Sequence, residues 1–205
     1  MMKHIYIMMC ILALGLPLST EAITADQVLA KTVAKINGSP SISASFTATT
    51  GDGARTTGTY TMSGRCFSLV SNDYASWYDG SNLWSYSRAS GETSLSAPTA
   101  DELIEINPLE VISSSSKSFK AKLLKQDSSK YTLELTPVRK DASVSRAIVT
   151  ISAQTWLPVS VDASFSNSAR MSIAIPSAKI GNALPKSAFT YPAARYKGVE
   201  VIDLR

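Results

Sequence analysis

The strongest constraint on the fold is the alternation of apolar and polar side chains that runs through most of the chain after residue 40. Tyr131, Leu133 and Leu135 alternate with polar residues, and segments 159–165 and 171–175 repeat the pattern. Successive side chains of a strand point to opposite faces, so the alternation predicts strands with one apolar and one solvated face. We count about ten such segments without a long linker, which predicts one domain built on an antiparallel sheet.

Two short helices are also predicted, and each begins with a capping box. The first box is Thr24 with Gln27, and the second is Thr99 with Glu102. The apolar sides of these helices comprise Leu29, Val33, Ile36, Leu103 and Ile106.

The apolar face of the sheet has to be covered. A second sheet would give a sandwich, and closure would give a barrel. In a third arrangement, short helices lie across a curved sheet. This is the one arrangement of the three that accounts for helices of this size at these positions. We therefore predict a mainly β fold, an unclosed antiparallel barrel of about ten to eleven strands with a few short helices as a lid. Helices this short leave space beneath them, and we expect an apolar cavity there.

The N-terminus has the pattern of a secretory signal, so we expect a signal peptide at residues 1–22 and one domain at 23–205. A basic start is followed by an apolar run, Ile5–Leu18, and by small residues at the predicted cleavage site. Cleavage removes His4 and Cys10, so Cys66 is the one thiol left. A mature chain without histidine excludes a Ser-His-Asp relay, and a single cysteine excludes an internal disulfide and disfavours zinc.

The charge of the chain is modest, at +4. Its densest basic stretch, residues 117–125, holds lysines that alternate with apolar residues. This stretch is either the solvated face of a strand or a docking patch for an acidic partner. No motif for nucleic acid is present.

The segment 74–86 reads as an aromatic hairpin around the Asp79-Gly80 turn. Trp84 and Tyr86 share one face of its second strand. They form either part of an ordinary core or one wall of a site for an apolar ligand.

Several segments, taken in order, resemble the LolA family of periplasmic carriers of outer-membrane lipoproteins. The Asp-Gly turn before Leu-Trp-x-Tyr resembles the most recognisable motif of that family. The matching segments are Ser41–Thr47, Gly58–Met62, Arg65–Leu69, Asp79–Tyr86, Asn107–Leu109 and Gly198–Asp203.

This resemblance implies an unclosed barrel whose cavity receives acyl chains of lipoproteins and performs no covalent chemistry, with no cofactor, metal or catalytic residue. The implied partners are an inner-membrane lipoprotein-releasing transporter and an outer-membrane receptor. The implied location is the periplasm of a Gram-negative bacterium, and we expect a monomer.

The resemblance also leads to a hypothesis for the site. The cavity wall would be formed by Phe46, Tyr60, Met62, Phe67, Leu69, Trp84 and Tyr86. The underside of the lid would be Leu29, Val33, Leu103 and Ile106.

The chain also departs from the family. Arg65 is the candidate for an arginine that holds the lid closed, or it is an ordinary surface residue, and Cys66 replaces the proline that usually follows. Ser85 stands where an aromatic residue is usual. These differences place the chain as a divergent relative.

Three other functions compete with the carrier. The outer-membrane receptor of the pathway is itself a lipoprotein, which the context of Cys10 disfavours. A lipid-sensing or envelope-stress regulator with the same half-barrel remains open, because fold does not fix function. An enzyme would need a carboxylate pair such as Asp101, Glu102 or Glu105, but acidic residues at a helix start are favoured for stability alone.

Overall fold

The computed structural model describes residues 22–107, 112 and 118–205, so residues 1–21 of the predicted signal and most of the Asn107–Leu109 motif lie outside the described part. Its strands are β1 (Ser41–Thr50), β2 (Arg55–Ser63), β3 (Cys66–Ser71), β4 (Tyr74–Tyr78), β5 (Leu83–Ser87), β6 (Glu92–Ser96), β7 (Phe119–Gln126), β8 (Lys130–Pro137), β9 (Val144–Ser152), β10 (Pro158–Phe165), β11 (Arg170–Gly181) and β12 (Val201–Asp203).

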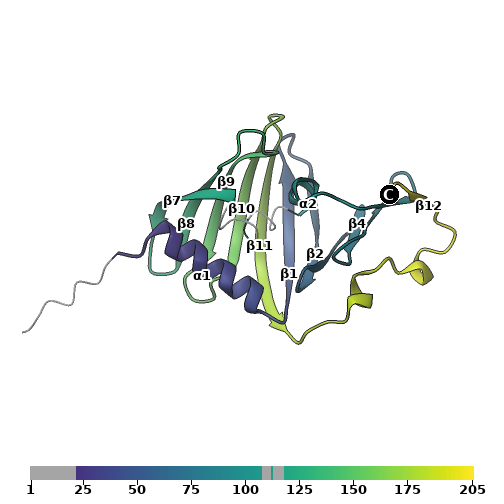
Figure 1. Cartoon of the computed structure of the whole chain (residues 1–205), viewed down its shortest axis with the longest axis horizontal. Helices are drawn as coiled ribbons and strands as arrows, with labels where there is room; N and C mark the ends of the chain where they lie inside the picture. Colours follow the sequence, from purple (N-terminus) through teal and green to yellow (C-terminus); the bar gives the residue numbers. More distant parts are fainter. Residues whose placement is uncertain (1–21, 108–111, 113–117) are drawn as a thin grey trace, which may run out of the picture.

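These twelve strands form one sheet in the order β12-β6-β5-β4-β3-β2-β1-β11-β10-β9-β8-β7. Neighbouring strands are antiparallel, except that β12 pairs with β6 in parallel. The sheet is strongly curved, and β7 and β12 lie at its two ends (Figure 1). The predicted unclosed barrel is confirmed, with twelve strands instead of ten or eleven.

Both predicted helices are present, α1 (Ala25–Gly38) and α2 (Ala100–Ile106), and they cross the same face of the sheet (Figure 1). Both capping boxes are formed. Thr24 Oγ1 accepts from the Gln27 amide at 3.2 Å, and Thr99 Oγ1 accepts from the Glu102 amide at 3.3 Å. In the described part of the chain, no helix has the length and apolar character needed to cross a bilayer.

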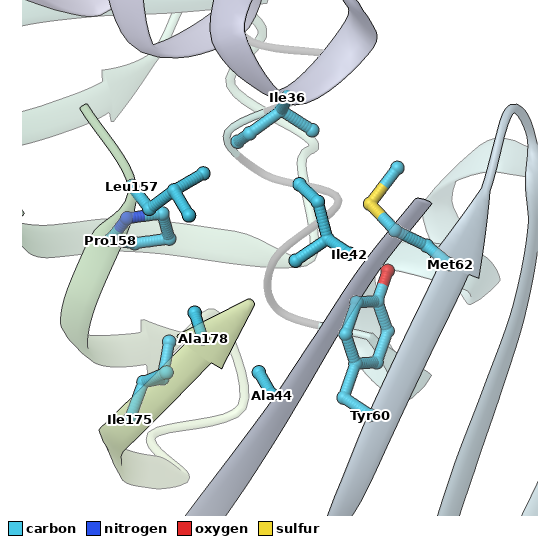
Figure 2. A pocket seen from close by; sticks show the side chains of 9 residues that line it. All are labelled: Ile36, Ile42, Ala44, Tyr60, Met62, Leu157, Pro158, Ile175 and Ala178. Carbon is cyan, nitrogen blue, oxygen red and sulfur yellow. The ribbon is translucent and has the colours of Figure 1, made fainter. Parts of the chain in front are cut away.

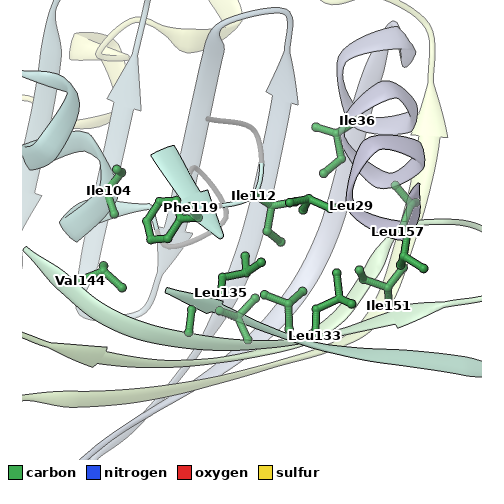
Figure 3. Close-up of a cluster of buried hydrophobic side chains, with 14 of the residues drawn as sticks. Leu29, Ile36, Ile104, Ile112, Phe119, Leu133, Leu135, Val144, Ile151 and Leu157 are labelled. Carbon is green, nitrogen blue, oxygen red and sulfur yellow. The ribbon is translucent and has the colours of Figure 1, made fainter. Parts of the chain in front are cut away.

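Helix α1 packs on the β7–β10 end of the sheet and completes a dense hydrophobic cluster, the α1 cluster (Figure 3). Leu133 and Leu135, predicted from the alternation to share the apolar face, are both completely buried there. Leu29 and Ile36 are also buried, whereas Val33 is only partly buried and Val28 is fully buried. This end of the molecule is a close-packed core of aliphatic side chains, with a hollow of about 30 Å³ beside Ile36 at its border.

Strands β1–β5 and β11 carry a second cluster, the cavity cluster, which lies under α2. Its buried members are Ala44, Phe46, Tyr60, Phe67, Tyr78, Leu83, Ile173 and Ile175. Leu103 and Ile106 of α2 pack against it and are only partly buried. Helix α1 therefore covers the α1 cluster alone, whereas α2 covers the cavity cluster and also buries Ile104 in the α1 cluster.

The basic stretch of residues 117–125 lies on edge strand β7, apart from Lys117, which is outside the described residues. Lys120, Lys122 and Lys125 are exposed, whereas Phe119 is buried in the α1 cluster. The predicted solvated strand face is confirmed. Lysines on an edge strand also discourage pairing with other chains.

After β11 the chain crosses the other face of the sheet as the C-terminal segment, residues 182–200, before it joins the edge as β12 (Figure 1). Phe189 in this segment is 1% exposed. The ring centroid of Tyr196 lies 5.5 Å from that of Trp77 and 4.6 Å from that of Tyr86. Strands β4 and β5 are thus covered on both faces, by the cavity cluster on one side and by this segment on the other.

The Asp79-Gly80 turn between β4 and β5 anchors the C-terminal segment. Asp79 Oδ1 accepts from the backbone amides of Ser81 at 2.9 Å and Asn82 at 2.8 Å. Gly80 has a φ of +97°, which favours glycine. Lys186 Nζ lies 3.6 Å from Asp79 Oδ2, so the turn is tied to residue 186 of the segment.

The Asp79→Asn variant is expected to lose about 1–3 kcal/mol of stability at neutral pH, because a buried charge-assisted hydrogen-bond network is weakened. Burial by itself raises the pKa of Asp79, but the hydrogen bonds from Asn82 and Ser81 and the charge of Lys186 outweigh it and hold the pKa below its usual value. A lowered carboxyl pKa contributes stability above the unfolded value of about 4, and this contribution is lost as the pH falls through the lower folded value. Urea unfolding from neutral pH to acid should show the difference between the two proteins shrinking below about pH 4. A constant difference across this range would contradict the account.

Candidate ligand-binding site

A cavity of about 360 Å³ lies between α2 and the β1–β4 and β11 strands. Its apolar wall includes Ala44, Phe46, Ala48, Leu69, Ile173 and Ile175. Ile106 and Asn107 line it from the end of α2. None of the described side chains that line this cavity is charged, and most are apolar, so its lining suits an apolar ligand.

One end of the cavity is polar. Thr50, Thr56, Ser71 and Tyr74 line it, and they stand at the end of β1, the start of β2, the end of β3 and the start of β4. Because these strands are antiparallel neighbours, the four positions meet at the same ends of β1–β4. An amphipathic ligand would therefore place its polar group at these strand ends.

Small residues create the space. Ala44 and Ala48 lie on the same face of β1 as Phe46, and their methyl groups leave the volume that larger side chains would fill. Gly58 stands opposite Phe46, and a Cβ at Gly58 would clash with the backbone carbonyl oxygen of Val70 and lie 2.7 Å from the ring of Phe46. Glycine is required at this position because the backbone of β3 and the phenyl ring leave no room for a side chain.

The structure brings five of the seven predicted wall residues together. Phe46, Tyr60 and Leu69 line the main cavity. Met62 lines a separate hollow of about 30 Å³ beside Ile36, which Figure 2 shows together with Tyr60. A third hollow of about 90 Å³ is lined by Phe67 together with Tyr60 and Met62.

The other two predicted wall residues, Trp84 and Tyr86, lie on the opposite face of the sheet and are corrected here. Tyr86 packs against Tyr196 of the C-terminal segment. Trp84 stands opposite Trp77, whose ring contacts the same segment. Their neighbour Leu83, on the alternate face, belongs to the cavity cluster instead. The alternation predicted correctly that Trp84 and Tyr86 share a face, but not which face the cavity occupies.

The predicted lid residues also divide between two places. Ile106 lines the main cavity, and Leu103 lines the 90 Å³ hollow. Leu29 and Val33 belong to the α1 cluster and line none of these three hollows. Of the two helices, α2 is therefore the one that lines the main cavity.

Arg65 is exposed in the turn between β2 and β3 and lines the 90 Å³ hollow beside Asn37 and Leu103. Within the described residues, no hydrogen bond joins its guanidinium to either helix. The contact that ties α2 to the sheet is made by Asn107, whose Nδ2 donates to Tyr60 Oη at 3.1 Å. From the sequence, Asn107 is predicted only to end the helix. In the structure it is 1% exposed, and a polar side chain so deeply buried needs a hydrogen-bond partner.

The titratable groups near α2 have structural roles. Glu102 accepts hydrogen bonds from Thr99 in the capping box, and these lower its pKa. Asp101 pairs with Arg139 at 3.5 Å. The side chain of Glu105 is outside the described part. Cys66 is half-buried, and desolvation raises the pKa of its thiol, which disfavours the reactive thiolate.

The described residues contain no group of three or more side chains that could hold a metal ion. The arrangement thus offers an apolar cavity with a polar edge and a short covering helix.

Comparison with known proteins identifies the family. The family model described as "Outer membrane lipoprotein carrier protein LolA" matches residues 17–165. No curated protein matches the sequence significantly. An uncharacterized conserved protein from Thermus thermophilus has a similar structure, with a TM-score of 0.57 and 11% identity over 86% of this chain and 98% of that one.

Two further solved structures are more distant. A LolA superfamily protein from Nitrosomonas europaea has a TM-score of 0.45 and 13% identity, over 83% of this chain and 99% of that one. MucB, in its complex with MucA from Pseudomonas aeruginosa, has a TM-score of 0.43 and 13% identity, over 82% of this chain and 61% of that one. The family model covers most of the chain, and the chain therefore belongs, as a divergent member, to the family of the outer membrane lipoprotein carrier protein LolA.

Proposed function

We propose that this protein carries the acyl chains of lipoproteins through the periplasm, taking them from an inner-membrane transporter and passing them to an outer-membrane receptor. The observation that carries this proposal is the uncharged, largely apolar cavity of about 360 Å³ beneath a short helix. Membership of the family supports the same function. Residues 1–22 would be the signal peptide that delivers one carrier domain, residues 23–205, to the periplasm.

The cavity fits the physical needs of a carrier. A buried methylene contributes about 0.8 kcal/mol, so an acyl chain must be shielded from water during transfer. The hydroxyl groups of Thr50, Thr56 and Tyr74 would receive the polar end of the cargo while the chain extends under Ile106. No bond is made or broken in this process.

The lid has to open, because the cavity volume is near the lower end of the usual range of about 300–1,000 Å³ for ligand sites. Helix α2 has only seven residues, and its apolar contacts are made by the half-buried Leu103 and Ile106 and by the buried Ile104. Because this apolar face is so small, opening the lid requires much less free energy than unfolding the protein. Helix α1 stays in place, because its buried side chains are part of the dense α1 cluster.

The test is the binding of a fluorescent peptide that carries a palmitoyl chain, measured by anisotropy against the same peptide without the chain. We expect wild-type protein to bind only the acylated form. Ile106→Asn should weaken this binding by about tenfold or more, because the lid loses its apolar contact with the chain.

Ile202→Asn is the matched control, because Ile202 is 38% exposed on β12 and far from the cavity in the sheet order. Equal binding of both peptides by the wild type would contradict the carrier function. A protein that binds no acyl chain but captures an envelope protein would favour a regulatory role on the same fold.

A further inference from the structure

Tyr60 stands between the three hollows beneath the helices. The main cavity of about 360 Å³, the hollow of about 30 Å³ near Ile36 and the hollow of about 90 Å³ near Leu103 are separate, and Tyr60 is the one described side chain that lines all three. An acyl chain that extended from one hollow into another would therefore pass the phenol ring of Tyr60.

The ring is held between small and large neighbours. Tyr60 is 5% exposed and stands opposite Ala44 on β1 and Leu69 on β3. Its centroid lies 6.1 Å from that of Phe67. Figure 2 shows the hydroxyl end of the ring beside Ile42 and Met62. The ring packs against Phe67, and the two hollows that it lines together with Ala44 leave space beside it.

The hydroxyl of Tyr60 is tied to the lid. Asn107, the residue that caps the C-terminal end of α2, donates its Nδ2 to Tyr60 Oη at 3.1 Å, and its backbone amide donates to the Leu103 carbonyl at 2.8 Å. Asn107 is 1% exposed and lines the main cavity beside Ile106. Movement of α2 and rotation of Tyr60 are therefore coupled through this hydrogen bond.

We propose that Tyr60 is the specificity-determining residue for acyl-chain length, and that Asn107 holds it in the position that closes the cavity. With the bond formed, only the main cavity accepts a chain. When α2 lifts, Asn107 releases the phenol, and rotation of the ring joins the three hollows into one longer site. This inference rests on the proposed carrier function and specifies its cargo, a long linear acyl chain admitted only with the lid displaced.

The first experiment tests the bond between lid and ring. Tyr60→Phe keeps the ring and removes the hydroxyl. Tyr131→Phe is the matched control, because Tyr131 lies on β8 against the ring of Trp156 and lines none of the three hollows. Stopped-flow exchange of a fluorescent palmitoyl peptide should be about fivefold to tenfold faster in both directions for Tyr60→Phe, and nearly unchanged for Tyr131→Phe. Equal exchange rates in the two variants would overturn the coupling.

The second experiment tests the length limit, with fluorescent peptides that carry one linear chain each, from octanoyl to eicosanoyl. Wild-type affinity should rise by about fourfold per methylene until the site is filled, and then level off. Tyr60→Ala should move that limit to longer chains by several carbons. Tyr131→Ala is the control of the same size change and should leave the limit unchanged, because Tyr131 lines none of the three hollows.

The outcomes separate the two proposals. The same length limit in wild type and Tyr60→Ala would overturn the assignment of Tyr60 while leaving the carrier function intact. A wild-type protein that binds no chain of any length would overturn the carrier function itself. Cooperative thermal unfolding of each variant shows that it is folded before binding is compared.

Discussion

Replacing Ala48 with tryptophan is expected to weaken the binding of an acylated peptide by at least about a hundredfold and to leave the fold intact. Ala48 lies on β1 opposite Thr56 and Ile173 and lines the main cavity without being fully buried. An indole there would take up the volume that receives the chain. Excluding even four methylenes removes about 3 kcal/mol of transfer free energy, which corresponds to the stated loss of affinity.

Ala174→Trp provides the matched control for this cavity-filling change. Ala174 is exposed on β11, next in sequence to Ile173 and on the other face of the sheet. It should bind the acylated peptide as the wild type does in the anisotropy titration. Both variants should unfold cooperatively, and Ala48→Trp should be no less stable, because it fills space without removing a packed group. Wild-type affinity in a folded Ala48→Trp variant would show that the ligand binds elsewhere.

The Phe189→Ala variant is expected to lose about 3–5 kcal/mol of unfolding free energy, the usual cost of removing a buried phenyl ring. Phe189 is 1% exposed, and the short 3-10 helix that it ends, Lys186–Phe189, lies against β3. This segment also covers Trp77 and Tyr86, so its release would expose a second apolar face. The effect would be large because the segment is part of the core and not a loose tail.

Urea unfolding followed by circular dichroism measures this loss. Leu184→Ala is the control in the same segment, because Leu184 is 39% exposed and its loss should change the unfolding free energy by no more than about 0.5 kcal/mol. A loss below about 1 kcal/mol for Phe189→Ala would mean that the C-terminal segment contributes little to the fold.

The strands were largely predictable because most of them have one apolar and one solvated face. Leu133 and Leu135 show why, since each points into the α1 cluster and its neighbours point to solvent. The alternation is weak where strands are short or irregular. In β6 the one large apolar residue is Leu95, and in β9 the buried Val144 and Ala147 are three residues apart, next to a register shift between β9 and β10. These features explain why twelve strands are present where about ten segments were recognisable.

The wall of the site was less predictable at the aromatic hairpin. Trp77, Tyr78 and Leu83 are all buried, on alternate faces of β4 and β5, so consecutive apolar residues indicate a strand that is covered on both sides. What covers each face depends on the C-terminal segment, more than a hundred residues later in the chain. Sequence periodicity cannot assign Trp84 and Tyr86 to one cover or the other, because it is a local property.

The cavity itself depends on what is missing from the packing. Ala44 and Ala48 are unremarkable in sequence, yet their small side chains leave the space that Phe46 and Ile173 do not fill. The bond between Asn107 and Tyr60 joins residues 47 positions apart, which no local pattern reveals. Pattern therefore predicts the elements and much of the core, whereas volumes and long-range polar contacts require the structure.

Native mass spectrometry of the mature protein, purified from a periplasm alongside the Ala48→Trp variant, tests the central claim most directly. The account predicts that wild-type protein carries the additional mass of an acylated lipid or lipopeptide, and that the variant has only the mass of its own chain. A wild-type protein that remains free of lipid even after incubation with an acylated peptide, or a variant that carries the same added mass, would contradict the claim that this cavity is the carrier site.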